Sequence, residues 1–121
     1  MLLTDVALVN QRTGAAIATA VERAVTRTSR RRGLLGRDGL GASCALMLEP
    51  CAAVHTAFMR FAIDVLFLDR DGCAVKIVSD VSPWRIALAA RAYAVVEMAA
   101  GTVRRRGVQL GDRFYVSPGG A

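Results

Sequence analysis

The sequence has almost no lysine and few aromatic residues, and both shortages narrow the choice of partners. Lys76 is the only lysine, so the net charge of +6 comes almost entirely from arginine. Aromatic residues make up 6% of the chain, which leaves few rings to stack on nucleic-acid bases. Two clusters, Arg30-Arg31-Arg32 and Arg104-Arg105-Arg106, keep a basic nucleic-acid-associated protein open as an alternative. Solvated helix faces explain such clusters more simply, so we do not expect a nucleic-acid partner.

Long apolar runs are missing too, although 54% of the residues are hydrophobic. No uncharged run reaches the roughly 18 residues of a membrane-spanning helix. The longest candidate, residues 39–59, is interrupted by Glu49 and Pro50. The first residues also lack the basic leader of a secretory signal, and Asp5 falls where the apolar core of one would begin. We expect a cytoplasmic protein with no membrane segment, folded as a single domain over residues 1–121.

The three cysteines do not have the spacing of a metal site or of a disulfide framework. Cys44, Cys51 and Cys73 are an odd number in a chain with no recognisable export signal. They could join His55 as four zinc ligands, but no CxxC pair holds two of them together. We therefore expect free, mostly buried thiols, no metal and no cofactor.

Short apolar segments separated by turn residues predict an α+β fold. Its mainly antiparallel sheet of short strands has room to close into a barrel, and two short helices accompany it. The predicted strands are 5–9, 15–24, 45–48, 54–61, 63–68, 73–81, 93–98 and 113–116, and the predicted helices are 28–35 and 102–106. Residues 63–68 have the composition of a central strand buried on both faces. The residues from Asp69 to Gly72 have the chemistry of a tight hairpin turn.

The segment from Pro50 to Gly72 contains the strongest functional signal. It carries Cys51, the only histidine, His55, and Asp64 within an apolar run. A buried carboxylate must be paired, hydrogen-bonded or protonated, because its desolvation cost is high. If residues 54–61 are extended, His55 and Met59 point to the same side.

These residues support more than one interpretation. Cys51 and His55 could form a thiolate nucleophile whose imidazole Asp64 orients, as in a small hydrolase or transferase. Alternatively, Cys51 packs, His55 binds a loop carbonyl, and Asp64 accepts backbone N–H groups or pairs with Arg60 or Arg37. Trp84 follows Pro83 in a loop, where it covers either a pocket mouth or the edge of the core.

Three blocks of sequence resemble the domain-of-unknown-function 192 family, which is small, widespread in bacteria and biochemically uncharacterised. They are Gly33 to Arg37 (GLLGR), the middle block from Pro50 to Val65, and Val96-Glu97-Met98 with the later Ala100-Gly101 and Gly111-Asp112. The middle block is similar to a subfamily pattern PC-x3-HTFFMRFPIDV, and the likeness covers roughly residues 17–116. Ala57 stands where that pattern has the first of its two adjacent phenylalanines, and Ala62 stands where it has proline. Neither change touches Cys51, His55 or Asp64.

The resemblance implies a fold and a site but no reaction. We expect a non-catalytic ligand-binding or accessory module with a pocket near Cys51, His55 and Asp64. Arg60 would lie beside these residues and Arg37 and Trp84 at the rim of the pocket. These three are the candidates for binding a small molecule or a protein partner. Whether the protein is an enzyme stays open, and Cys51, His55 and Asp64 are the catalytic candidates if it is one.

Overall fold

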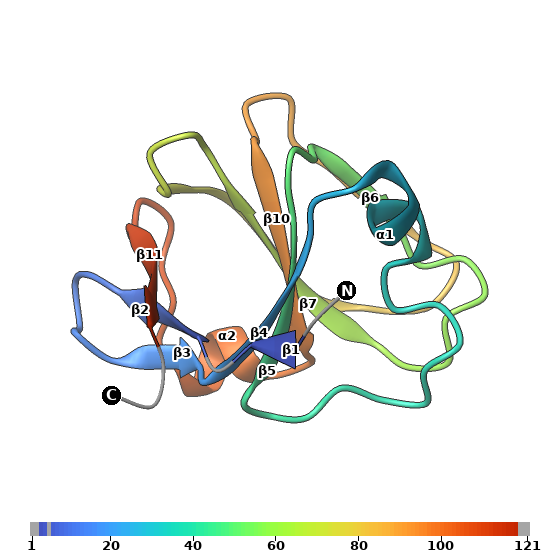
Figure 1. The fold of residues 1–121 in the computed structure, drawn as a ribbon, viewed down its shortest axis with the longest axis horizontal. Helices are drawn as coiled ribbons and strands as arrows, with labels where there is room; N and C mark the ends of the chain where they lie inside the picture. Colours follow the sequence, from blue (N-terminus) through green and yellow to red (C-terminus); the bar gives the residue numbers. More distant parts are fainter. Residues whose placement is uncertain (1–2, 5, 119–121) are drawn as a thin grey trace.

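The computed structural model describes residues 3–4 and 6–118, and within them thirteen short elements follow one another (Figure 1). The first seven are β1 (Leu3–Thr4), β2 (Val6–Asn10), β3 (Ala16–Ala18), β4 (Ala20–Ala24), α1 (Arg27–Arg32), β5 (Cys44–Leu48) and β6 (Ala53–His55). The remaining six are β7 (Ile63–Leu68), β8 (Ala74–Val81), β9 (Ile86–Leu88), β10 (Ala94–Ala99), α2 (Thr102–Arg105) and β11 (Phe114–Pro118). The predicted α+β class, with a mainly antiparallel sheet and two short helices, is confirmed for this part of the chain.

The described strands form three sheets and not one closed barrel. The largest has six strands in the order β1-β4-β5-β10-β7-β8, and only the β4–β5 pair is parallel. A second sheet, β11-β2-β3, and a small pair, β6-β9, are antiparallel. Neither helix of the described chain is long and apolar enough to cross a membrane.

The six-stranded sheet separates two apolar clusters, one on each face. Alternate residues of its central strands enter different clusters, because successive side chains in a strand point to opposite faces. Leu66 and Val96 belong to the cluster on the side of α2 and the three-stranded sheet. Val65 and Val95 belong to the cluster on the side of α1 and the β6–β9 pair. Every residue of β7 is buried, as its apolar composition predicted.

The predicted turn between β7 and β8 forms at Asp69 to Gly72. The Gly72 N–H donates to the carbonyl of Asp69 at 3.0 Å, and the φ of Gly72 is 84°. A Cβ atom at this position would lie 2.5 Å from the carbonyl oxygen of Phe114. Glycine is therefore required both for the turn and for the close approach of β11.

Several predicted boundaries were wrong. Residues 15–24 form two strands, because the chain leaves one sheet for another at Thr19, whose N–H donates to the Ser43 carbonyl. Helix α1 begins at Arg27, because Thr26 and Ser29 cap each other reciprocally. It ends at Arg32, ahead of the predicted stop at Gly36, because Gly33 closes it with a φ of 49° and donates its N–H to the Ser29 carbonyl. Strand β9 was not among the predicted strands. Asp5, the first residue of the strand predicted at 5–9, lies outside the described residues.

The predicted strand at 54–61 was wrong in a way that affects the site. Strand β6 ends at His55, and the Met59 N–H then turns back to the carbonyl of Thr56 at 3.1 Å. Thr56 is buried, and its hydroxyl donates to the Ser82 carbonyl at 2.7 Å and accepts the Arg85 N–H at 2.8 Å. Because the extended backbone stops there, His55 is exposed and Met59 is buried, so they do not alternate along one strand, although both border a pocket between α1 and the sheet.

Candidate functional site

Two carboxylic acids are buried in the central strands of the six-stranded sheet, and the first is Asp64 on β7. Its side chain is 1% exposed and accepts three backbone N–H groups. Oδ1 accepts from Asp80 at 2.9 Å, while Oδ2 accepts from Gly101 at 3.1 Å and from Val103 at 2.9 Å. Gly101 and Val103 lie at the start of α2, where a negative charge is favourable. Asp64 therefore ties α2 and the end of β8 to the sheet, and neither Arg37 nor Arg60 reaches it.

The second buried acid is Glu97 on β10, which is 3% exposed. Within the described chain its carboxyl group accepts no hydrogen bond from the protein. No described side-chain polar atom is both fully enclosed and unpartnered, so the Glu97 oxygens must open onto the pocket beside them. Burial raises the pKa of Glu97 to about 7, and the more distant positive charge of Arg37 opposes this rise.

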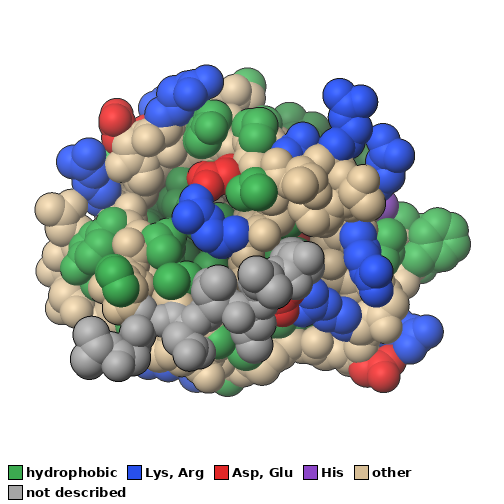
Figure 2. Space-filling model, viewed as in Figure 1, with side chains coloured by type: hydrophobic (Ala, Val, Ile, Leu, Met, Phe, Trp, Pro, Cys, Tyr) green, Lys and Arg blue, Asp and Glu red, His purple; other side chains and the backbone are tan. Residues whose placement is uncertain are grey.

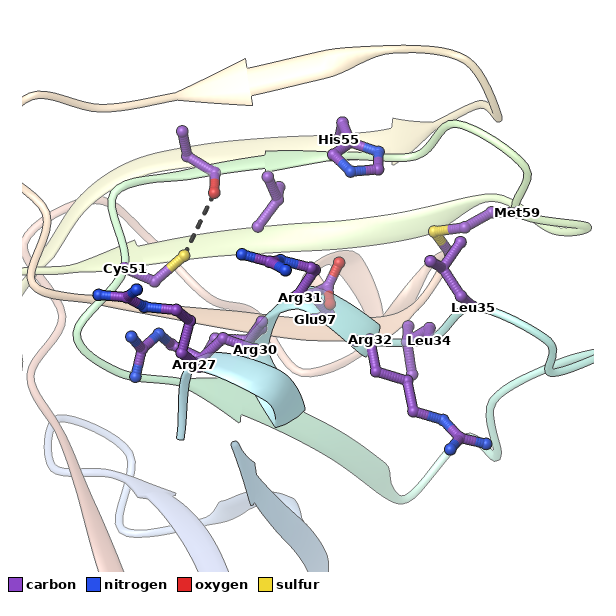
Figure 3. Close-up of a pocket in the computed structure, with 14 residues that line it drawn as sticks. Arg27, Arg30, Arg31, Arg32, Leu34, Leu35, Cys51, His55, Met59 and Glu97 are labelled. Carbon is purple, nitrogen blue, oxygen red and sulfur yellow. Dashed lines mark hydrogen bonds between the residues drawn. The ribbon is translucent and has the colours of Figure 1, made fainter. Parts of the chain in front are cut away.

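That pocket lies between α1 and the sheet and has a volume of about 350 Å³ (Figure 3). Arginines of α1 stand along one side of it, and His55 lies on β6 across from them. Glu97, Leu48, Leu34 and Met59 supply its acidic and apolar lining. This size and mixture of surfaces suit a small molecule.

The pocket arginines carry most of its charge. Arg27, Arg31 and Arg32 have no hydrogen-bond or ion-pair partner among the described residues, whereas Arg30 donates to the Val25 carbonyl at 2.7 Å. Four other arginines form described salt bridges, which are Arg12–Asp112, Arg23–Glu49, Arg37–Glu22 and Arg60–Asp38, while arginines such as Arg85, Arg91 and Arg104 form none within the described chain. Helix α1 contains no acidic residue that could neutralise its own arginines. An anion entering the pocket would meet unpaired positive charge.

Cys51 and His55 both line this pocket, but no hydrogen bond joins the two described side chains. The Cys51 thiol donates instead to the carbonyl of Ala53, with an Sγ to oxygen distance of 3.2 Å. Burial raises the pKa of the Cys51 thiol above its ordinary value, and the nearby charge of Glu97 adds to this effect. Reactive cysteines need the opposite shift, so the surroundings of Cys51 favour a neutral thiol.

The three residues predicted to bind the ligand, Arg37, Arg60 and Trp84, lie outside this pocket. Arg37 makes a bidentate pair with Glu22, at 2.9 and 2.7 Å, beside a second hollow on the outer side of α1. Arg60 binds the exposed carboxylate of Asp38 at 2.6 Å. Neither arginine, nor Trp84, nor Asp64 is among the residues that line the pocket.

Trp84 belongs to an exposed aromatic pair. Its ring meets the ring of Phe58 edge to face, with 4.5 Å between centroids, and the side chains are 60% and 72% exposed. Both residues have a left-handed backbone, with φ of 67° and 64°. On the face shown in Figure 2, a hydrophobic projection and several basic side chains lie next to the single histidine.

Sequence reasoning missed Glu97 and the arginines of α1 as parts of one site. Glu97 was noted only as part of the third sequence block and not as a site candidate. Its position in an apolar strand is nevertheless the same signal that drew attention to Asp64. The arginines looked like a solvated cluster. In the described part of the chain, no three His, Cys, Asp or Glu side chains lie close enough to hold a metal ion, and the absence of zinc from the purified protein stays a prediction.

The model of the DUF192 family, described as uncharacterized ACR, matches residues 8–116. The chain therefore belongs to this family, as its three sequence blocks indicated. A curated relative, UPF0127 protein PF1050 of Pyrococcus furiosus, is 40% identical over 64 residues, which are 52% of this chain and 54% of that protein. The chain thus matches about half the length of that relative.

Two crystal structures share the fold, each with a TM-score of 0.80. One is a protein of Sinorhizobium meliloti 1021 named as a proposed transcription regulator; it is 26% identical, and the match covers 92% of this chain and 91% of that one. The other, from Novosphingobium aromaticivorans DSM 12444, is a protein of unknown function; it is 22% identical, over 93% of this chain and 84% of that one.

Proposed function

We propose that the protein is a non-catalytic binding module that holds a small anionic molecule in the pocket between α1 and the sheet. One observation carries the proposal: unpaired arginines of α1 and the unpartnered carboxyl group of Glu97 open onto the same pocket. A buried acid without a hydrogen-bond donor costs stability, so a fold retains Glu97 where it has another use. Arg27, Arg31 and Arg32 of α1 are exposed, which leaves their charge available to an anion.

The chemistry around Cys51 favours binding over catalysis. A hydrolase or transferase that uses Cys51 needs a thiolate and a base within hydrogen-bond reach. Here the thiol donates to the Ala53 carbonyl, and its raised pKa keeps it protonated. Asp64, the third candidate of such a triad, lies on the other face of the sheet, where both of its carboxylate oxygens accept backbone N–H groups.

The nucleic-acid alternative is less well supported. The basic residues Arg104 to Arg106 and the α1 arginines lie on helices at opposite faces of the sheet, so they do not form one continuous track (Figure 1). The regulator role suggested for the Sinorhizobium protein concerns that protein, and a gel-shift assay with random duplex DNA would test whether it extends to this one.

The test is a thermal-shift screen with small carboxylates and phosphates, in which a ligand of the folded state raises the melting temperature. The variant Arg27→Gln/Arg31→Gln/Arg32→Gln removes three pocket charges. Its matched control, Arg104→Gln/Arg105→Gln/Arg106→Gln, removes the same charge from exposed positions of and beside α2. We expect the shift to disappear in the first variant and to persist in the control.

Two results would overturn the proposal. In the first, no carboxylate or phosphate at millimolar concentration raises the melting temperature of the wild type. In the second, both triple variants lose the shift equally, which would show that net charge and not the pocket attracts the anion.

A further inference from the structure

Glu97 sits where a strand residue would ordinarily be apolar. Its strand, β10, lies in the middle of the six-stranded sheet, with β5 on one side and β7 on the other. The residues paired with it across the two ladders are Leu46 and Val65, both 0% exposed. A methionine or leucine at this position would fill the same space with no desolvation cost.

The pocket presents two polar groups of opposite charge. The α1 arginines offer positive charge along the helix, while the Glu97 carboxyl group lies at the sheet, close to Gly33 (Figure 3). Leu34, Leu48 and Met59 add apolar side chains to the same lining. A simple anion would satisfy the arginines, yet it would leave Glu97 without a hydrogen-bond partner.

We propose that the ligand is bipolar: it presents a carboxylate or phosphate to the arginines of α1 and a hydrogen-bond donor, an ammonium or hydroxyl group, to Glu97. This inference rests on the proposed function and adds the class of molecule that the pocket selects. The Glu97 oxygens are ready to accept, because no described protein donor occupies them. A short apolar linker of the ligand would contact the apolar lining of the pocket.

A buried acceptor of this kind discriminates strongly. A ligand that lacks the donor leaves Glu97 desolvated and unpaired, whereas a ligand that supplies it forms a charge-assisted hydrogen bond. Such a difference corresponds to about tenfold or more in affinity. A second carboxylate at the same end would be repelled when Glu97 is ionised.

The experiment measures the affinity of matched straight-chain acids by isothermal titration calorimetry at pH 8. Each ω-amino acid is compared with the ω-hydroxy acid, the fatty acid and the diacid of the same length, for chains of three, four and six carbons. We expect the amino and hydroxy acids of the best length to bind about tenfold more tightly than the fatty acid. The diacid should bind most weakly.

Variants at Glu97 separate its role from that of the arginines. Glu97→Leu should abolish the preference for the donor-bearing acids and leave fatty-acid binding in place. Glu97→Gln should keep the hydroxy-acid preference, since its amide oxygen still accepts a hydrogen bond. It should lose the amino-acid preference, because it has no negative charge to pair with the ammonium group. Neither variant should alter the dependence on Arg27, Arg31 and Arg32.

The outcomes distinguish the two proposals. If the four kinds of acid bind the wild type equally and binding still depends on the α1 arginines, the bipolar inference is wrong and the proposed function stands. If no acid or phosphate binds the wild type, the proposed function is wrong and the inference falls with it. Equal selectivity in wild type and Glu97→Leu would likewise overturn the inference.

Discussion

Asp64 and Glu97 are one register step apart on paired strands, yet they face opposite sides of the sheet. Glu97 of β10 lies opposite Val65, and Asp64 lies opposite Met98. Directly opposed residues share a face, so Glu97 points toward α1 and Asp64 points toward α2. The first carboxyl group has no hydrogen bond from the described protein, and the second has three. The two acids therefore have different uses.

Replacing Asp64 by alanine should destabilise the protein by roughly 3–5 kcal/mol. The substitution removes the acceptor of the three backbone N–H groups that tie α2 and β8 to the sheet. Asp64→Asn should cost less, since its single amide oxygen still accepts from part of this set. Denaturant unfolding of both variants measures the effect. Asp38→Ala is the control, as its side chain is 87% exposed and it should change little. An unchanged midpoint for Asp64→Ala would contradict the anchoring role.

Glu97 should make the protein less stable at alkaline pH. Its pKa rises from 4.5 to about 7 on folding, so its favourable contribution is fully present below pH 4.5 and is lost as the pH passes 7. The loss amounts to about 3 kcal/mol by pH 9. Glu97→Gln should therefore be more stable than the wild type at pH 9 by a similar amount and nearly equal to it at pH 4.5.

Glu22→Gln supplies a control of opposite sign. The hydrogen bond from Arg37 lowers the pKa of Glu22 on folding, so its contribution is present above pH 4.5 and is lost in acid. This variant should be less stable than the wild type at pH 9. Urea melts of the wild type and Glu97→Gln at pH 4.5 and 9, and of the wild type and Glu22→Gln at pH 9 and at a pH well below 4.5, check the two signs. If the wild type instead became more stable relative to Glu97→Gln as the pH rises, the prediction of a raised Glu97 pKa would be wrong.

Cys51 should react slowly with iodoacetamide. Burial raises its pKa, so the thiolate that attacks the reagent is scarce at neutral pH. In a Cys44→Ser/Cys73→Ser background, the native protein should be alkylated more slowly than the same protein unfolded in urea. Adding Glu97→Gln should speed the native reaction, because it removes a negative charge that helps to raise the pKa. Faster alkylation of the native than of the unfolded chain would favour a catalytic thiol instead.

The exposed pair Phe58–Trp84 should contribute little to stability. Both rings are largely in water, and both residues adopt a backbone conformation that glycine adopts without strain. Trp84→Gly should change the free energy of unfolding by no more than about 1 kcal/mol. Phe67→Ala, which removes a fully buried ring, should cost about 3–5 kcal/mol and serves as the control. A large loss in Trp84→Gly would show that the pair holds its two loops together.

Some features follow from the sequence alone. The apolar run from Ile63 to Leu68 determined a strand buried on both faces, and Gly72 determined the turn after it. Both depend on residues close together in the chain, where hydrophobic content and backbone preference act directly. The resemblance of the three sequence blocks likewise predicted the family, which the family model confirms over residues 8–116.

Only the tertiary structure decided which of these residues form a site. Asp64 finds its partner Val103 across 39 positions, and Glu97 meets the α1 arginines through a fold that brings β10 beneath that helix. Thr56 ends β6 by bonding to a loop some thirty residues away, which separates His55 from Met59. A local pattern sets whether a side chain is buried. The long-range pairing of strands sets the face on which it lies and the groups it meets there.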